Sequence, residues 1–121
     1  MQHKLDIYPR FLSHALQVRQ STEFPQLDQH EERLMDQLAT SWTQGKKITV
    51  LFAMRMCDDA SASTVHRRLK TLRIKGMLEL ELDQDDNRVK FIVPTELAKN
   101  YITALGQSVV MAAGAERPRS A

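Results

Sequence analysis

The stretch of sequence that decides the fold is SASTVHRRLKTLRIKGML, residues 61–78. Ser61 is a residue type that commonly caps a helix N-terminus, and the apolar residues Val65, Leu69 and Leu72 recur at the spacing of one helical face. Gly76 closes the pattern, as glycine does after many helices. Every Arg and Lys lies off the apolar stripe. The stretch therefore predicts a helix over 61–75 with a basic face turned to solvent.

Two alternating stretches follow and predict an antiparallel β-hairpin with a loop at 84–87. The apolar positions are every second residue: Leu78, Leu80 and Leu82 in the first stretch, and Val89, Phe91 and Val93 in the second. The register that we expect joins apolar to apolar and acid to base, pairing Leu82 with Val89, Leu80 with Phe91, Glu81 with Lys90 and Asp83 with Arg88. The six apolar residues would then face the core together.

The residues before 61 predict three further helices. Pro9 suits the first turn of an amphipathic helix over 9–20, and 21–27 is a linker. Asp28 and Glu31 have capping-box spacing, which starts a second helix that ends near Gly45. Thr49 can cap a short helix over 50–56, whose continuous apolar character predicts burial. A tight turn is expected at 57–60.

The end of the chain predicts one more helix. It opens at Pro94-Thr95 and covers 95–113, and a disordered tail follows at 114–121. The predicted organisation is an N-terminal helix and linker at 1–26, a central domain at 27–94, the C-terminal helix and the tail. The fold class is mainly α with a small β-hairpin, an α+β arrangement.

Composition excludes several classes of protein. With 42% hydrophobic and 26% charged residues among 121, the chain is typical of a globular domain, and it contains neither a bilayer-spanning apolar run nor a secretory signal. A single cysteine, Cys57, precludes an intrachain disulfide and favours the cytoplasm. The four histidines form no metal-ligand spacing, and no catalytic motif is present. We therefore expect a non-enzyme without metal or cofactor, with Trp42 and four methionines as core residues: Met35, Met54, Met56 and Met77.

The order helix, short helix, turn, basic helix and hairpin is that of a winged helix-turn-helix. Residues 61–78 resemble the recognition-helix signature of MarR-type winged-helix regulators, with a Ser-Thr-Val start at Ser63, later leucines and the closing Gly76. Asp86-Asn87-Arg88 resembles the Asp-x-Arg wing tip of that family. Thr95 and Gly106 resemble, more loosely, the Thr-rich segment with which the family's last helix begins. The resemblance covers residues 34–106.

The resemblance implies duplex DNA as the partner, with helix 61–75 in the major groove and the wing at 83–88 in the minor groove. The stretch 61–76 carries five basic residues and no acidic one, although the net charge of the chain is only +2. The candidate DNA contacts are Thr49, Ser61, Ser63, Thr64, His66, Arg67, Arg68, Lys70 and Arg88. A solvated basic face is the alternative for the helix, and an ion pair with Asp83 or Asp86 is the alternative for Arg88.

Both terminal helices carry apolar stripes and predict a homodimer. The expected interface consists of Phe11, Leu12, Leu16, Leu97, Tyr101, Ile102 and Leu105, with Ile7, Ala15 and Val109 beside them. The resulting hypothesis is a sequence-specific transcription regulator that represses by occupying a promoter. The alternatives are a winged-helix module that docks a protein, and a plasmid or phage replication protein of the same fold. No effector ligand is indicated.

Overall fold

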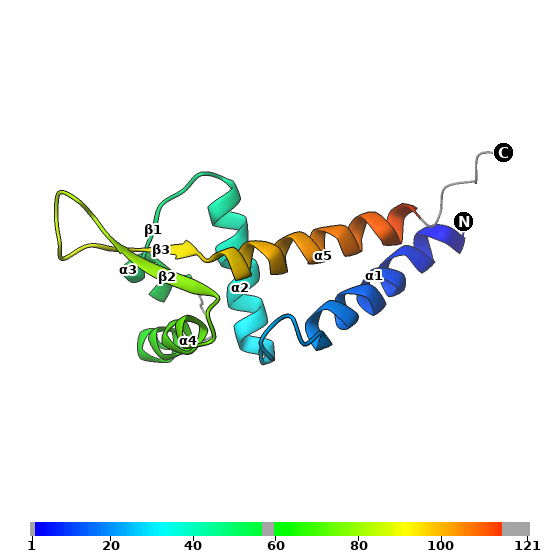
Figure 1. Ribbon diagram of the computed structural model, residues 1–121, viewed down its shortest axis with the longest axis horizontal. Helices are drawn as coiled ribbons and strands as arrows, with labels where there is room; N and C mark the ends of the chain where they lie inside the picture. The colour runs from blue at the N-terminus through cyan, green and yellow to red at the C-terminus, as the bar shows by residue number, and fades with distance from the viewer. Residues whose placement is uncertain (1, 57–59, 115–121) are drawn as a thin grey trace. The chain divides into compact units, whose positions relative to one another are not determined.

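The computed structural model describes residues 2–56 and 60–114 of the chain. The expected turn around Cys57 and the expected tail beyond Gly114 lie outside these residues. The elements in chain order (Figure 1) are α1 (Gln2–Gln20), α2 (Gln29–Thr43), β1 (Ile48–Thr49), α3 (Val50–Met54), α4 (Ala62–Ile74), β2 (Leu78–Leu82), β3 (Lys90–Pro94) and α5 (Glu96–Gly114). The chain divides into two compact units, one with Leu27–Lys99 and the other with the residues before and after that segment.

The helix starts of the central unit follow the local sequence, and the expected caps are confirmed. Asp28 and Glu31 form a complete capping box at α2, since each side chain accepts the backbone N–H of the other at 2.8 Å. Thr49 caps α3 by accepting the Phe52 N–H, and Ser61 caps α4 by accepting the Thr64 N–H. These ends depend on residues three apart, which explains why sequence spacing located them.

The sheet is antiparallel and has three strands in the order β1-β3-β2. The expected hairpin is present, but the expected register is wrong by one residue. Leu80 pairs with Ile92, Glu81 with Phe91 and Leu82 with Lys90. Neither the Glu81–Lys90 nor the Asp83–Arg88 pairing occurs.

The short strand β1 gives the physical reason for this register. Ile48 of β1 pairs with Ile92 on the side of β3 opposite to β2, so Ile92 lies in the central strand of the sheet. Both side chains are 1% exposed. The Trp42 indole N–H donates to the Ile92 carbonyl at 3.0 Å and holds the same position. A shift of one residue turns every side chain of a strand over. Phe91, expected in the core, is therefore only half-buried and lies under the Lys47 ammonium, which is 5.2 Å from the ring centre.

The short helix α3 differs from expectation in its burial. Only Ala53 is buried, whereas Leu51 is 66% exposed and Phe52 is 53% exposed. A helix of one and a half turns contacts its neighbours through one face, so its remaining apolar side chains face outward even when the sequence is apolar throughout. The expectation of a buried helix over 50–56 is thus corrected: the helix ends at Met54, and only one of its faces is buried.

The other unit contains α1 and most of α5. The helix α1 begins at Gln2 instead of near Pro9, which lies in the helix interior. The missing N–H of Pro9 removes one helical hydrogen bond, but the apolar face continues across it from Ile7 to Phe11 and to the fully buried Ala15. Within this unit the Phe24 ring packs edge-on against Tyr101 at 5.4 Å. The helix α5 extends to Gly114, slightly beyond the predicted end. In the described part of the chain, no helix has the length and apolarity needed to cross a membrane.

Candidate nucleic-acid interface

The basic helix α4 is held firmly at both ends. At its N-terminus the Ser61 hydroxyl lies 2.9 Å from that of Thr64 and 3.2 Å from that of Ser63, forming a small exposed cluster of hydroxyls. At its C-terminus Gly76 has φ +83°, and Gly76 and Met77 donate their N–H groups to the carbonyls of Arg73 and Leu72. These two hydrogen bonds together form a Schellman motif. Val65, Leu69 and Leu72 are buried as expected, which orients the rest of the helix outward.

The cations of α4 divide into two groups. Lys75 donates to the Glu31 carboxylate at 2.7 Å, and Glu31 is 3% exposed. Arg68 lies seven residues before Lys75, on the same side of the helix, and is half-buried. In contrast, Arg67, Lys70 and Arg73 are exposed, and among the residues that the structure describes none of the three makes an ion pair. These three positively charged side chains of α4 are therefore accessible to a negatively charged ligand.

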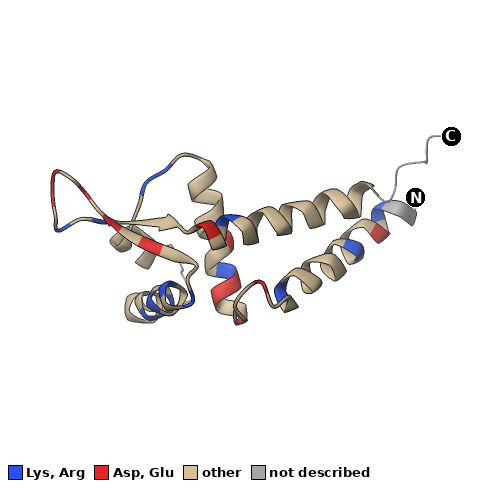
Figure 2. Ribbon diagram, in the orientation of Figure 1, with Lys and Arg blue, Asp and Glu red and all other residues tan. Residues whose placement is uncertain are grey.

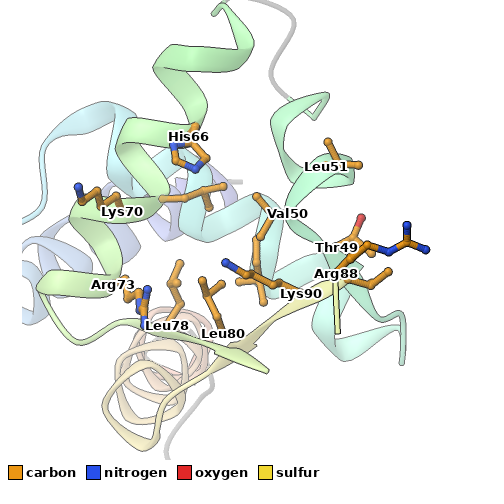
Figure 3. A pocket seen from close by; sticks show the side chains of 13 residues that line it. Thr49, Val50, Leu51, His66, Lys70, Arg73, Leu78, Leu80, Arg88 and Lys90 are labelled. Atoms are coloured by element: carbon orange, nitrogen blue, oxygen red, sulfur yellow. The ribbon is translucent and has the colours of Figure 1, made fainter. Parts of the chain in front are cut away.

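The same helix forms one wall of a groove of about 690 Å³. The other walls come from the β1–α3 junction and from the hairpin (Figure 3). The groove has an apolar floor that includes Val50, Leu51, Leu69, Leu78, Leu80 and Ile92. Its remaining lining is Val89, Thr49 and five basic residues: His66, Lys70, Arg73, Arg88 and Lys90. Among the residues 2–56 and 60–114, no Asp or Glu lines this groove.

Acidic residues gather elsewhere on the hairpin. Glu79 and Glu81 point to the face of β2 opposite the leucines, and Asp83, Asp85 and Asp86 lie in the loop (Figure 2). The hairpin therefore has an acidic face and a groove face that carries Lys90. This separation of charge gives the groove a positive potential that the net charge of the chain does not reveal.

Arg88 at the tip of the hairpin is held by a carboxylate. Its Nε and Nη2 donate to the two Asp86 carboxylate oxygens at 3.1 and 3.3 Å, and its backbone N–H donates to Asp86 Oδ1 at 3.1 Å. The Arg88 side chain bonds, and then its backbone bond, hold the pKa of Asp86 below its ordinary value. The Arg88 side chain is nevertheless 91% exposed, so it can contact a ligand while remaining oriented by Asp86.

The structure brings together only some of the predicted DNA contacts. Thr49, His66, Lys70 and Arg88 line the groove. The hydroxyls of Ser61, Ser63 and Thr64 lie at the start of α4, where Arg67 donates to Thr64 Oγ1 at 3.5 Å. Arg68 does not line the groove, and it follows Thr64 by four residues on the side of α4 that also carries Lys75. The predicted site is therefore a surface over α4 and the hairpin, with Arg68 at its margin.

Two groove residues, Arg73 and Lys90, are absent from the predicted contacts. Arg73 belongs to the basic stretch, and its spacing of seven from His66 and three from Lys70 places it on their side of α4. The sequence did not predict Lys90 as a groove residue, because the expected register paired it with Glu81 on the acidic face. The observed register turns it toward the groove with Ile92 and Leu80.

The predicted dimer residues also separate into two sets. Tyr101 is 2% exposed within one chain, where it packs on Phe24 and accepts a hydrogen bond from Arg19 at 3.3 Å. Ala15 is likewise buried, and Phe11, Leu97, Ile102 and Leu105 are half-buried. Leu12, Leu16 and Val109 remain exposed. The exposed large apolar residues of α1 form a stripe at helical spacing, consisting of Leu5, Tyr8, Leu12 and Leu16.

Trp42 and the methionines mostly serve packing, as expected. Met35 and Met77 are fully buried and Met54 and Met56 half-buried, while Trp42 is half-buried and bonded to β3. Within the described ranges 2–56 and 60–114, no group of three or more His, Cys, Asp or Glu side chains could hold a metal ion. Comparison with models of protein families, with curated proteins and with solved structures gives no significant match.

Proposed function

We propose that the protein is a sequence-specific regulator of transcription that binds duplex DNA and represses by occupying a promoter. In this proposal α4 enters the major groove of DNA, and the hairpin acts as the wing that follows the adjacent minor groove. The observation that carries the proposal is the set of exposed cations on α4, Arg67, Lys70 and Arg73, on a helix fixed by caps at both ends. Such a helix presents cations and hydroxyls at little further cost in conformational entropy.

The roles within this surface follow from their chemistry. Arg67 has the planar fork that recognises guanine O6 and N7, and the hydroxyls of Ser63 and Thr64 suit either bases or phosphates. Lys70 and Arg73 lie nearer the groove and suit phosphates. Arg88, oriented by Asp86, suits a narrow minor groove, where A·T-rich sequence concentrates negative potential. The order of elements resembles the winged helix-turn-helix of MarR-type regulators, and the chain would act in the cytoplasm as a binding protein without catalysis.

The exposed stripe on α1 supports a homodimer as the working form. Four large apolar side chains of one helix, each between 45 and 70% exposed, form a continuous surface that a second copy would cover. Two α4 helices related by a two-fold axis would reach major-groove faces about 34–36 Å apart, which predicts an inverted repeat with half-site centres about 10 base pairs apart.

Selection from a random duplex pool tests this function. We expect the full-length protein to enrich an inverted repeat, and Arg67→Ala to enrich a motif that is degenerate at one position in each half-site. Lys99→Ala, on α5 outside this surface, serves as the matched control and should enrich the original motif. A pool in which the wild-type protein enriches no sequence would contradict sequence-specific binding.

A docking module for another protein is the second candidate, because Leu51 and Phe52 expose apolar surface on α3 beside the basic helix. The two functions predict different ionic-strength dependence. DNA affinity falls along a log–log line whose slope counts the phosphates neutralised, whereas an apolar contact with a protein shows little salt dependence.

A further inference from the structure

The strand β2 has a neighbour on one side only, because the strand order of the sheet is β1-β3-β2. The Asp83 N–H donates to the Val89 carbonyl at 3.0 Å, which continues the β2–β3 ladder by one pair beyond Leu82. Antiparallel strands exchange hydrogen bonds at every second pair, so Leu80 and Leu82 turn their backbone N–H and C=O groups away from β3. In the described parts of the chain, no backbone group outside the sheet bonds to these two residues. This edge can therefore pair with a further strand.

The two faces of the sheet differ in charge along this edge. On one face β2 presents Glu79 and Glu81, both exposed, and Figure 2 shows the acidic residues along the hairpin. On the other face Leu80 is half-buried and Leu82 is exposed, and Lys90 lies directly across from Leu82. A strand added at the edge would thus have carboxylates beside one set of its side chains. Its other set would lie beside leucines, with an ammonium group next to them.

We propose that this edge binds an extended segment of another protein, in which basic residues alternate with apolar ones. The backbone of the segment pairs with Leu80 and Leu82, which is the recognition mode of β-strand addition. Its basic side chains lie beside Glu79 and Glu81, since opposite charges on neighbouring strands attract. Its apolar side chains lie beside the leucines, because Lys90 repels a second cation on that face. The charges of the hairpin thus select both the composition of the segment and the phase of its alternation.

A second copy of β2 does not suit the same edge. Two β2 strands that pair with their acidic faces on one side bring Glu79 and Glu81 against the same carboxylates of the other copy, and like charges directly opposite destabilise a sheet. Charged residues on an edge strand are a common protection against self-pairing. The occupant is therefore a partner of opposite charge. None of the residues 79–82 is among the proposed DNA contacts, so this inference does not depend on the proposed function.

A heptapeptide amide of alternating lysine and valine, with lysine at both ends, serves as the probe. It is titrated into the isotope-labelled full chain and followed by NMR. We expect saturable shifts of the Leu80 and Leu82 amides and slower exchange of their N–H hydrogens, because both become hydrogen-bonded. A peptide of the same composition, with all lysines before the valines, should bind about fivefold more weakly. A peptide with glutamate in place of lysine should not bind.

Substitutions at Leu82 separate the role of the backbone from that of the side chain. Leu82→Pro removes the outward N–H and leaves the bonds to β3 in place, because proline is tolerated on an edge strand where its nitrogen faces solvent. We expect it to weaken peptide binding by about tenfold, whereas Leu82→Ala keeps the N–H and should bind within about threefold of the wild type. Slow amide exchange at Ile92, in the central strand, shows that each variant is folded.

The charge is tested at a neighbouring position. Glu81→Gln should weaken binding of the alternating peptide by about two- to fivefold, since it removes one attraction between opposite charges on neighbouring strands. Glu23→Gln makes the same change at an exposed position outside the central unit and should bind as the wild type does.

Three results would overturn the proposal: no shift of the Leu80 and Leu82 amides, equal affinity for the two lysine–valine peptides, or equal affinity in Leu82→Pro and Leu82→Ala. Slow exchange of both amides that appears as the protein concentration rises, without peptide, would assign the edge to a second copy instead. A protein that binds the peptide but no DNA would contradict only the proposed function.

Discussion

Glu31 links two helices through one buried carboxylate. Its Oε1 accepts the backbone N–H of Asp28 at 2.8 Å and the Lys75 ammonium at 2.7 Å, so it both caps α2 and fixes the end of α4. Because a glutamine at this position retains an acceptor for the Asp28 N–H, Glu31→Gln isolates the ion pair. We expect it to lower the free energy of unfolding by about 1–3 kcal/mol in urea titrations, with the partial exposure of Lys75 limiting the loss. Glu79→Gln, on an exposed strand position, is the control and should change stability little; an equal effect of both would contradict a structural role for the pair.

The Arg88–Asp86 pair makes a prediction about pH. The pKa of the half-buried Asp86 is lowered mainly by the Arg88 side chain. A carboxyl with a lowered pKa in the folded chain contributes its stabilisation of the loop above its unfolded pKa and loses it as the pH falls through the folded value. Arg88→Ala should therefore raise the pKa of Asp86 toward its ordinary value in an NMR titration of the carboxyl, with the helical circular dichroism spectrum unchanged. Arg67→Ala should leave that titration as it is, and an unchanged Asp86 pKa in Arg88→Ala would show that the pair does not form.

Arg88→Ala also tests the wing in DNA binding. The variant should weaken binding to sites flanked by A·T steps more than to sites flanked by G·C steps, because the narrow minor groove of A·T-rich DNA attracts an inserted arginine. Affinity for paired duplexes that differ only in their flanks measures this effect. A uniform loss across both duplexes would assign Arg88 to phosphate contact.

Among the helices and strands, the features that depend on residues close in sequence could be predicted, and those that depend on distant residues could not. The caps at Asp28, Thr49 and Ser61 and the stop at Gly76 depend on residues within one turn, and the sequence spacing located all of them. The hairpin register depends on Ile48, which is 44 residues from its partner Ile92, and β1 is too short to show an alternating pattern. The Lys75–Glu31 pair spans the same separation. The groove could therefore not be predicted from the sequence, since its lining depends on the correct hairpin register and on the pairing of β1 with β3.

The register itself can be tested by truncation. Ile92 is 1% exposed at the centre of the sheet, so Ile92→Ala should cost about 2–5 kcal/mol of unfolding free energy. Phe91→Ala should cost clearly less despite the larger side chain, because Phe91 is half-buried beneath Lys47. Chemical denaturation of both variants measures the order. A larger loss for Phe91→Ala would favour the alternating register expected from sequence.

At the scale of the whole molecule, the exposed stripe on α1 predicts self-association. Light scattering should give twice the 13.9 kDa of the chain at micromolar concentration. The double variant Leu12→Glu, Leu16→Glu should be monomeric with an unchanged helical circular dichroism spectrum, since both side chains are exposed. Leu82→Glu introduces the same change at a position of similar exposure in the hairpin, 55% against 54% for Leu16, and should remain a dimer. A wild-type monomer under these conditions would exclude the two-fold arrangement and the operator spacing that depends on it.

The central claim is that exposed cations of α4 bind the phosphates of duplex DNA, and the salt dependence of binding tests it most directly. Affinity for the selected duplex is measured over a range of salt concentrations for the wild type, Lys70→Ala and the control Lys99→Ala. We predict a linear fall of log affinity with log salt, a slope smaller by about one in Lys70→Ala, and the wild-type slope in Lys99→Ala. An affinity that does not vary with salt, or the same slope in Lys70→Ala and the wild type, would contradict the claim.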